Sequence, residues 1–356
     1  MTALTKRSFL LCCPKNRRCF INIFVTFSKT KLKDFAMPLV IIVFMGLMLA
    51  FPEHYMKATG RGLALFASNV LPAMFPFLFL NTMLSNTKAI PFINKALEKP
   101  VNKIFGVVKE GAFVLISALI CGYPVGAVTT ARLYENGDIS RDDAKSFLPF
   151  TSLAGPVFIL STVSSVFGDK NVGLVVLISH YVGTFINGLL WRFVSRTRAR
   201  TRSNIENGRI ALNTSSILSA DSEKSTNNLL GEAVTSSALS MLTVGGYIVL
   251  FGLVVDTFAL LPFWGDLPAI LRVVFTFPVE MTRGVVEAST LASLPLAVGF
   301  ATLSVTFGGV SVLAQQYHFL SRCNCGVFDL ILPKISQGIL GFFSAIIFSI
   351  IFFNIS

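Results

Sequence analysis

Two stretches in the first half of the chain each have a counterpart in the second half, and this internal repeat constrains the fold more than any other feature. SNVLPAMFPFLFLNTML (68–84) has a counterpart in SALSMLTVGGYIVLFGLVV (237–255), and SLAGPVFILSTV (152–163) has one in TFGGVSVLAQQY (306–317). Each stretch lies in an apolar segment about twenty residues long, the length of a bilayer-spanning helix. A repeated membrane unit with a broken helix in each copy predicts a transporter, because unwound backbone at membrane depth is tolerated where protein or a watery cavity satisfies it.

The composition indicates an integral membrane protein. Hydrophobic residues make up 53% of the 356 residues and charged residues only 13%, which is too apolar for an ordinary soluble protein. The formal net charge is +12. The basic residues gather in short segments beside apolar runs, a pattern typical of cytoplasmic loops rather than of a nucleic-acid-binding surface. We therefore expect the lipid bilayer as a partner and no nucleic acid.

The polar segments divide the chain into four regions. Residues 1–36 are rich in Lys and Arg and contain a single acid, so we expect a basic N-terminal tail in the cytoplasm. A first transmembrane half is expected over 37–195, and a second over 229–356. Residues 196–228 lose the apolar pattern and gain Ser, Thr and Asn, which predicts a cytoplasmic linker between the halves.

The apolar runs predict the membrane topology. Spans are expected over 37–51, 62–84, 146–167, 172–194, 230–256, 297–320 and 329–353. The segment between residues 110 and 137 contains CGYPVG at its middle, and two interpretations compete: a single kinked span, or a re-entrant hairpin that returns to the cytoplasm. The arginines between 192 and 202 stay in the cytoplasm only with the hairpin, which the positive-inside rule therefore favours.

The second half repeats this order in the opposite direction. Residues 267–284, LPAILRVVFTFPVEMTRG, are expected to form an external amphipathic segment. A second hairpin is predicted over 284–297, GVVEASTLASLPLA, with its turn near Pro295. The expected fold class is therefore an all-α polytopic membrane protein with inverted-topology repeats, re-entrant hairpins and broken transmembrane helices.

Between the second span and the first hairpin, the sequence predicts a helix at the membrane interface. Lys95, Lys99 and Lys103 recur at every fourth residue opposite apolar side chains, which is the pattern of a helix lying on anionic headgroups. Pro91 and Pro100 are expected to keep this helix short and segmented.

The candidate site residues lie at the predicted turns and breaks. A half-helix end at a hairpin tip offers free amide groups and a partial positive charge, which suits carboxylates. Hydroxyl and amide side chains beside a helix break can coordinate a solute or can bond to their own helix. The substrate-binding candidates are Gly122, Tyr123, Pro124, Gly126, Thr151, Ser152, Gly155, Pro156, Glu287, Gly308, Gly309, Ser311 and Gln315.

Two titratable residues have alternative interpretations. Glu287 lies inside the second predicted hairpin, where it binds a cation, a proton or the substrate, or forms an interfacial ion pair with Arg283. His180 lies within a predicted span, where it relays protons or hydrogen-bonds a neighbouring helix. The sequence leaves open whether Na⁺ or H⁺ drives transport.

The sequence gives no support for catalysis or for a bound metal. Cys12, Cys13, Cys19, Cys323 and Cys325 lack the paired CxxC spacing of structural zinc sites. No nucleophile-elbow, P-loop, zinc-protease or dinucleotide-binding motif is present. We therefore expect neither an enzyme nor a cofactor, and the partner that we expect is a small-molecule solute. A homo-oligomer remains open.

The longest run of specific residues resembles a known family. CGYPVGAVTTARLYENGDISRDDAKSFLPFTSLAGPVFILSTVSSVFG, with LPAMFPFLFL before it and FGGVSVLAQ after it, is similar to the YlbJ-type sporulation integral membrane proteins. The resemblance extends from about Met37 to the C-terminus. These proteins contain a nucleoside-recognition or gate domain and look distantly like concentrative nucleoside transporters, whose halves are inverted repeats with re-entrant hairpins.

The resemblance implies a role in endospore formation, with movement of dipicolinic acid across the membrane around the forespore as the activity. We therefore expect a multi-pass membrane carrier of this small anionic solute that works by alternating access. One alternative is a nucleoside or nucleobase carrier. Another is a membrane scaffold without transport activity that recruits partners through the linker. The scaffold predicts that the linker is sensitive to substitution, whereas the carrier predicts that the glycines at the turns and breaks are.

Overall fold

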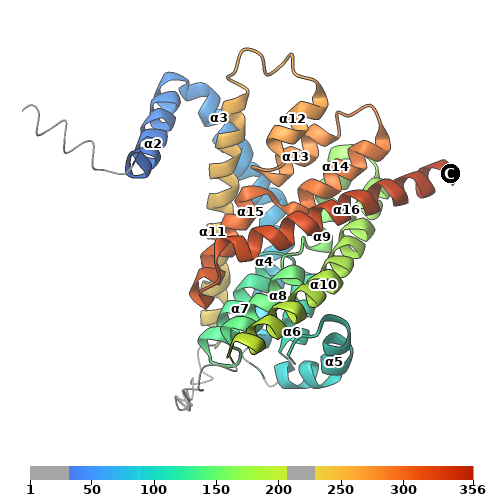
Figure 1. Ribbon diagram of the computed structural model, residues 1–356. Coiled ribbons are helices and arrows are strands. Elements are labelled where there is room, and N and C mark those ends of the chain that lie inside the picture. Colours follow the sequence, from blue (N-terminus) through green and yellow to red (C-terminus); the bar gives the residue numbers. More distant parts are fainter. Residues whose placement is uncertain (1–31, 86, 88, 109, 207–228, 356) are drawn as a thin grey trace, which may run out of the picture. The chain divides into compact units, whose positions relative to one another are not determined.

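The computed structural model describes residues 32–85, 87, 89–108, 110–206 and 229–355, which are helical with short connections and contain no strand (Figure 1). Within these ranges six helical segments are long and apolar enough to cross a membrane: Pro52–Ser85, Arg141–Phe167, Lys170–Val194, Leu229–Phe258, Leu294–Cys323 and Val327–Phe353. Each contains one of the predicted spans. The all-α polytopic fold class is therefore confirmed.

The chain divides into two compact units, residues 1–56 and 57–356. The described part of the first unit consists of α2 (Leu32–Ala50) and the start of α3 (Pro52–Leu65). The apolar part of α2, Phe35–Ala50, is shorter than the six spans, so a crossing at 37–51 stays a prediction. Most of the basic tail and residues 207–228 of the linker lie outside the described residues, while residues 196–206 continue α10.

In the second unit, the first repeat confirms the hairpin interpretation. Its elements after α3 are a π-helical turn (Phe66–Val70), α4 (Leu71–Ser85), α5 (Ala89–Phe105), α6 (Gly111–Cys121), α7 (Val125–Glu135), α8 (Arg141–Thr151), α9 (Pro156–Phe167) and α10 (Lys170–Glu206). Ser117 on α6 donates to Asn81, and Asn81 donates to Thr129 on α7. Both limbs therefore contact the same residue, as in a hairpin closed at Gly122–Pro124.

The second repeat places its hairpin earlier than predicted. Its elements are α11 (Leu229–Phe258), α12 (Ala269–Thr276), α13 (Met281–Ala288), α14 (Leu294–Phe307), α15 (Gly309–Leu320) and α16 (Val327–Ile355). The turn over 277–280 between α12 and α13 contacts the second helix break, whereas Pro295 lies in the first turn of α14. The prediction of a hairpin tip near Pro295 is therefore wrong. A proline starts a helix as readily as it breaks one.

The two repeats run in opposite directions. Gly62 contacts Val249, whereas Thr82 lies 3.5 Å from Ser237, measured between the two hydroxyl oxygens. The span Pro52–Ser85 and its counterpart α11 are therefore antiparallel, because the earlier residue of one contacts the later residue of the other. Antiparallel packing of equivalent helices is expected for an inverted-topology repeat.

The last helices of the two repeats, α10 and α16, are also antiparallel and lie side by side (Figure 1, yellow-green and red). Gly183 packs on Gly341 so closely that a Cβ on Gly183 would lie 2.7 Å from the Gly341 nitrogen. The Trp191 indole donates to Ser336. Trp191 follows Gly183 on α10, whereas Ser336 precedes Gly341 on α16, so the two helices run in opposite directions. Small residues let two helix backbones approach each other in this way.

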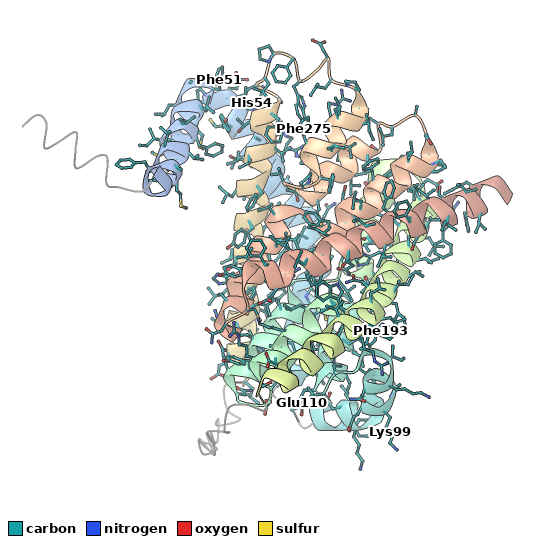
Figure 2. All side chains as sticks on the ribbon, in the orientation of Figure 1. Phe51, His54, Lys99, Glu110, Phe193 and Phe275 are labelled. Atoms are coloured by element: carbon teal, nitrogen blue, oxygen red, sulfur yellow. The ribbon has the colours of Figure 1, made fainter. Side chains whose placement is uncertain are left out.

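The helix α5 has the two faces that the sequence predicts. Lys95, Lys99 and Lys103 are exposed, and Figure 2 shows Lys99 pointing away from the other helices. The opposite face packs into the protein core through Phe105. The helix runs unbroken through Pro100, so the predicted segmentation is wrong there.

One face of α16 is apolar and uncovered. Ile339, Phe343, Ile347 and Ile351 recur at every fourth residue and are 48–59% exposed. A helix with a stripe of exposed large apolar side chains is suited to contact with lipid.

A glycine in the contact between α10 and α16 and a glycine in open space are predicted to respond oppositely to substitution by alanine. Gly183→Ala should lower the melting temperature, because its Cβ would clash with the backbone of α16, and overpacking costs about 1–3 kcal/mol. Gly246→Ala on α11 has no atom within 4 Å and should gain up to about 1 kcal/mol of helix propensity. Thermal unfolding of the purified variants in detergent measures both. Equal melting temperatures would contradict the close packing.

Candidate functional site

The first hairpin tip is hydrogen-bonded to the first helix break. The Tyr123 amide donates to the Leu153 carbonyl in the break between α8 and α9. Gly122 has φ 77°, and a Cβ there would lie 2.2 Å from the Gly155 nitrogen. Only glycine fits this position, because it tolerates positive φ and leaves room for the opposing backbone. The structure therefore brings Gly122, Tyr123 and Gly155 together.

The other predicted residues of the first repeat surround this contact. Gly126 packs against α8 so closely that a Cβ would lie 2.2 Å from the Thr151 carbonyl oxygen. Pro124 precedes the first residue of α7, and Pro156 is the first residue of α9. At the first position of a helix the missing N–H of proline costs no intrahelical hydrogen bond. Ser152 is buried at the break itself.

The second repeat has the same arrangement. The Ser311 amide donates to the Val279 carbonyl at 3.1 Å, which joins the second break to the tip between α12 and α13. Gly308 and Gly309 have φ values of 82° and 69°. A Cβ on Gly309 would lie 2.9 Å from the Val279 oxygen. In each half, a hairpin tip therefore contacts a helix break through backbone atoms.

The two hairpins also contact each other. The Tyr123 hydroxyl donates to the Met281 sulfur at the start of α13. Both side chains are buried. The tips of the two inverted hairpins consequently meet inside the protein.

A lysine joins the two breaks. Lys334 of α16 is 1% exposed, and its ammonium donates to the Ser152 carbonyl at 2.8 Å, to the Thr306 carbonyl and to the Gln337 side-chain oxygen at 3.3 Å. Ser152 and Thr306 lie at the C-terminal ends of α8 and α14. The last carbonyls of a helix lack intrahelical partners and carry the negative end of its dipole. They can therefore hold a cation.

Two further side chains cross between the breaks. The Ala154 amide donates to His180 Nε2 at 3.1 Å, and His180 Nδ1 lies 2.9 Å from the Thr306 hydroxyl. Because Nε2 accepts a hydrogen bond, a neutral ring carries its proton on Nδ1. Gln316 donates from its amide to the Ser152 hydroxyl. His180 therefore has the hydrogen-bonding role that the sequence offered as one alternative.

A cavity of about 220 Å³ lies beside the second tip. Its polar lining includes Arg61, Asn69, Thr162, Glu280, Thr282 and Arg283. Arg283 and Arg61 both contact the Asp256 carboxylate, at 2.9 and 3.2 Å. Two guanidinium groups therefore share one buried aspartate beside the cavity that Glu280 also lines.

Five buried polar atoms around the second tip and its break form no hydrogen bond. They are Thr162 Oγ1, Thr276 Oγ1, Glu280 Oε1, Ser311 Oγ and Gln315 Oε1. Most buried polar atoms in proteins are paired, so a cluster of unpaired ones requires an explanation. Of these five residues, Thr162 and Glu280 line the 220 Å³ cavity, where unpaired hydroxyl and carboxyl oxygens are suited to a polar ligand.

Larger polar cavities lie toward the other end of α11. One of about 850 Å³ is lined by Thr82, Thr129, Arg132 and Glu232, among others. Glu232 lies in the first turn of α11, whereas Gly252, which lines the 220 Å³ cavity, lies near its end. Polar space therefore occurs beside both hairpins, toward opposite ends of one long helix.

Glu287 lies apart from this arrangement. It forms an ion pair with Arg272 at 3.0 Å and does not line the cavity of the second tip. Arg283, its predicted partner, contacts Asp256 instead. The alternative of a Glu287–Arg283 pair is therefore wrong, because each residue pairs with a charge on another helix, Arg272 of α12 and Asp256 of α11.

Sequence reasoning missed three residues of the site. Glu280 was assigned to an external segment, although FPV at 277–279 repeats YPV at 123–125 and could have located the second tip. Lys334 is a charged residue inside an apolar span, which by itself indicates function. Gln316 was passed over for its neighbour Gln315. Among the described residues, no group of three potential metal ligands occurs.

These features define a multi-pass α-helical membrane protein in which two hairpins contact two broken helices. Residues 67–190 match the Gate family, described as nucleoside recognition. The chain is 27% identical over 316 residues to the sporulation integral membrane protein YlbJ of Bacillus subtilis (strain 168), covering 81% of this chain and 76% of that protein. The resemblance to YlbJ-type proteins is confirmed. No solved structure matches the chain.

The first tip predicts a difference between two glycines that share a positive φ. Gly122→Ala and Gly137→Ala both place alanine at positive φ, at 77° and 79°, and at Gly122 the ψ of −171° adds strain, because that region is open essentially to glycine alone. Only the Gly122 Cβ would also meet backbone, whereas Gly137 has no atom within 4 Å. Thermal unfolding should therefore show a clearly larger loss for Gly122→Ala. Equal losses would show that the tip and the break are not in contact.

Proposed function

We propose that the protein carries a small polar or anionic solute across the membrane by alternating access. The observation that supports this most is the paired contact of each hairpin tip with a helix break. In an inverted-repeat carrier, the solute binds where hairpins and broken helices of the two halves meet, and one part moves against the other around it. The polar cavities toward opposite ends of α11 would then be the two access routes.

The bonds that such a movement would break are few. The first tip is joined to its break by the hydrogen bond from the Tyr123 amide to the Leu153 carbonyl. The second tip is joined to its break by two hydrogen bonds, from the Ser311 amide to the Val279 carbonyl and from the Val310 amide to the Pro278 carbonyl. The contact between the tips is a hydroxyl on a thioether, and sulfur is a weak acceptor. Each hairpin could therefore leave its break at moderate cost.

For the solute, we propose dipicolinic acid in a sporulating host, with the membrane around the forespore as the location. The resemblance to YlbJ-type proteins suggests this substrate. A cavity of about 220 Å³ is smaller than the roughly 300–1,000 Å³ of sites for drug-sized ligands, which favours a compact solute with a single ring. Arg61 and Arg283 could pair with its carboxylates, because guanidinium groups bind carboxylates well.

A nucleoside or nucleobase is the second candidate. The Gate match, described as nucleoside recognition, favours it. Asn69, Thr162 and Glu280 line the cavity and could hydrogen-bond a base or a ribose. The small volume of the cavity argues more for a base than for a whole nucleoside.

Substitution of two arginines of the second hairpin region distinguishes a residue that contacts the solute from one that forms only a structural ion pair. Arg283→Gln should weaken dipicolinate binding by about ten- to a hundredfold, because a hydrogen bond to a charged group contributes about 1.5–3 kcal/mol. Arg272→Gln is the control, since Arg272 also pairs with a carboxylate but does not line the cavity. The measurement is saturable uptake and binding by purified protein in liposomes. An equal loss in both variants would contradict a direct role of Arg283.

Uridine in the same liposomes tests the second candidate. Uridine uptake without dipicolinate uptake would assign the protein to nucleoside carriers. No uptake of either solute from folded protein, under sodium and proton gradients, would count against the carrier function.

Substitution of two adjacent glutamines tests whether a buried polar atom without a hydrogen-bond partner contacts the solute. Gln315→Met should leave the melting temperature nearly unchanged, because its oxygen has no partner to lose, but should reduce solute uptake. Gln316→Met removes the hydrogen bond to Ser152 and should destabilise the fold by about 1–3 kcal/mol. Uptake and thermal unfolding are measured on both variants. Unaltered uptake by Gln315→Met would remove this residue from the site.

A further inference from the structure

The environment of Lys334 is that of a bound cation. Its ammonium contacts three oxygens, two of them backbone carbonyls at the C-terminal ends of α8 and α14. In carriers with broken helices, freed carbonyls and half-helix C-termini are the groups that coordinate a coupling Na⁺. In this protein, carbonyl oxygens of the same kind contact the Lys334 ammonium instead of a free ion.

No acidic side chain neutralises this charge. Within the described part of the chain, no carboxylate lies within 4.0 Å of the Lys334 nitrogen. The acid of its own helix, Asp329, pairs with Lys145 of α8 at 2.8 Å. From α10, the titratable group beside Lys334 is His180, which accepts a hydrogen bond from Ala154. The helix α14 contributes no titratable side chain.

Removing a buried ammonium from water is expensive unless other groups replace its hydration. Two helix C-termini and the Gln337 amide oxygen supply that replacement. Because Lys334 contacts a break in each repeat, the single charge stabilises both breaks. A free cation at this point would meet the same oxygens and would be repelled by the ammonium.

We propose that the Lys334 ammonium is a tethered substitute for a coupling cation, so that the protein binds no Na⁺ at its helix breaks. The consequence for coupling rests on the proposed carrier function: transport would not require a sodium gradient. The ion-binding part does not depend on any solute.

The first test measures ²²Na⁺ binding by the purified full-length protein. Wild type should show no saturable binding, and its melting temperature should be the same in sodium chloride and in choline chloride at equal ionic strength. Saturable Na⁺ binding by wild type would overturn the proposal, whatever the variants do.

The second test compares two variants that lack the charge. Lys334→Ala leaves space beside the carbonyls and should show saturable ²²Na⁺ binding, which wild type lacks, with a higher melting temperature in sodium than in choline. Lys334→Met is the matched control, because it removes the charge but fills the space, and it should not respond to sodium. A folded Lys334→Ala that ignores Na⁺ would overturn the proposal. If neither variant folds, the measurement on wild type decides.

Transport separates this proposal from the proposed function. Dipicolinate uptake at the same rate in sodium and choline would support the tethered cation, and uptake that requires sodium would overturn it. An absence of uptake would count against the carrier function alone, because ²²Na⁺ binding still decides the role of Lys334.

Discussion

A polypeptide that breaks its helices inside a bilayer must find partners for the backbone groups that it frees. In this protein the partners come from the opposing elements of the fold. Each hairpin tip donates to or accepts from a break. Lys334 and His180 bond to further backbone groups of the breaks, and Gln316 bonds to the Ser152 hydroxyl. The breaks are stable because both repeats, and both terminal helices of the repeats, meet at one place.

The larger elements could be predicted because they depend on local chemistry. Apolar length located the spans, and the helix-breaking residues of CGYPVG located the first hairpin. The second hairpin was misplaced because Arg272 and Glu280 made its limbs look like an external amphipathic segment. In the structure these charges have partners: Arg272 pairs with Glu287, and Glu280 caps α13 by accepting the Arg283 amide at 2.8 Å. Such pairing depends on tertiary neighbours, which composition does not reveal.

The contacts of Lys334 could not be predicted for a different reason. A lysine within an apolar run indicates function, but its acceptors here are carbonyls of Ser152 and Thr306, and every residue has a carbonyl. What makes these two available is that α8 and α14 end beside them. The partner is therefore determined by where two helices stop, not by a residue type.

The glycine contact between α10 and α16 has a consequence for how the molecule could change shape. His180 lies on α10 and Lys334 on α16, and the two helices touch through the backbones at Gly183 and Gly341. Two helices whose backbones are in contact cannot slide past each other without steric overlap. The pair therefore forms a fixed frame, and a displacement would be taken up by the short hairpins rather than by α10 and α16.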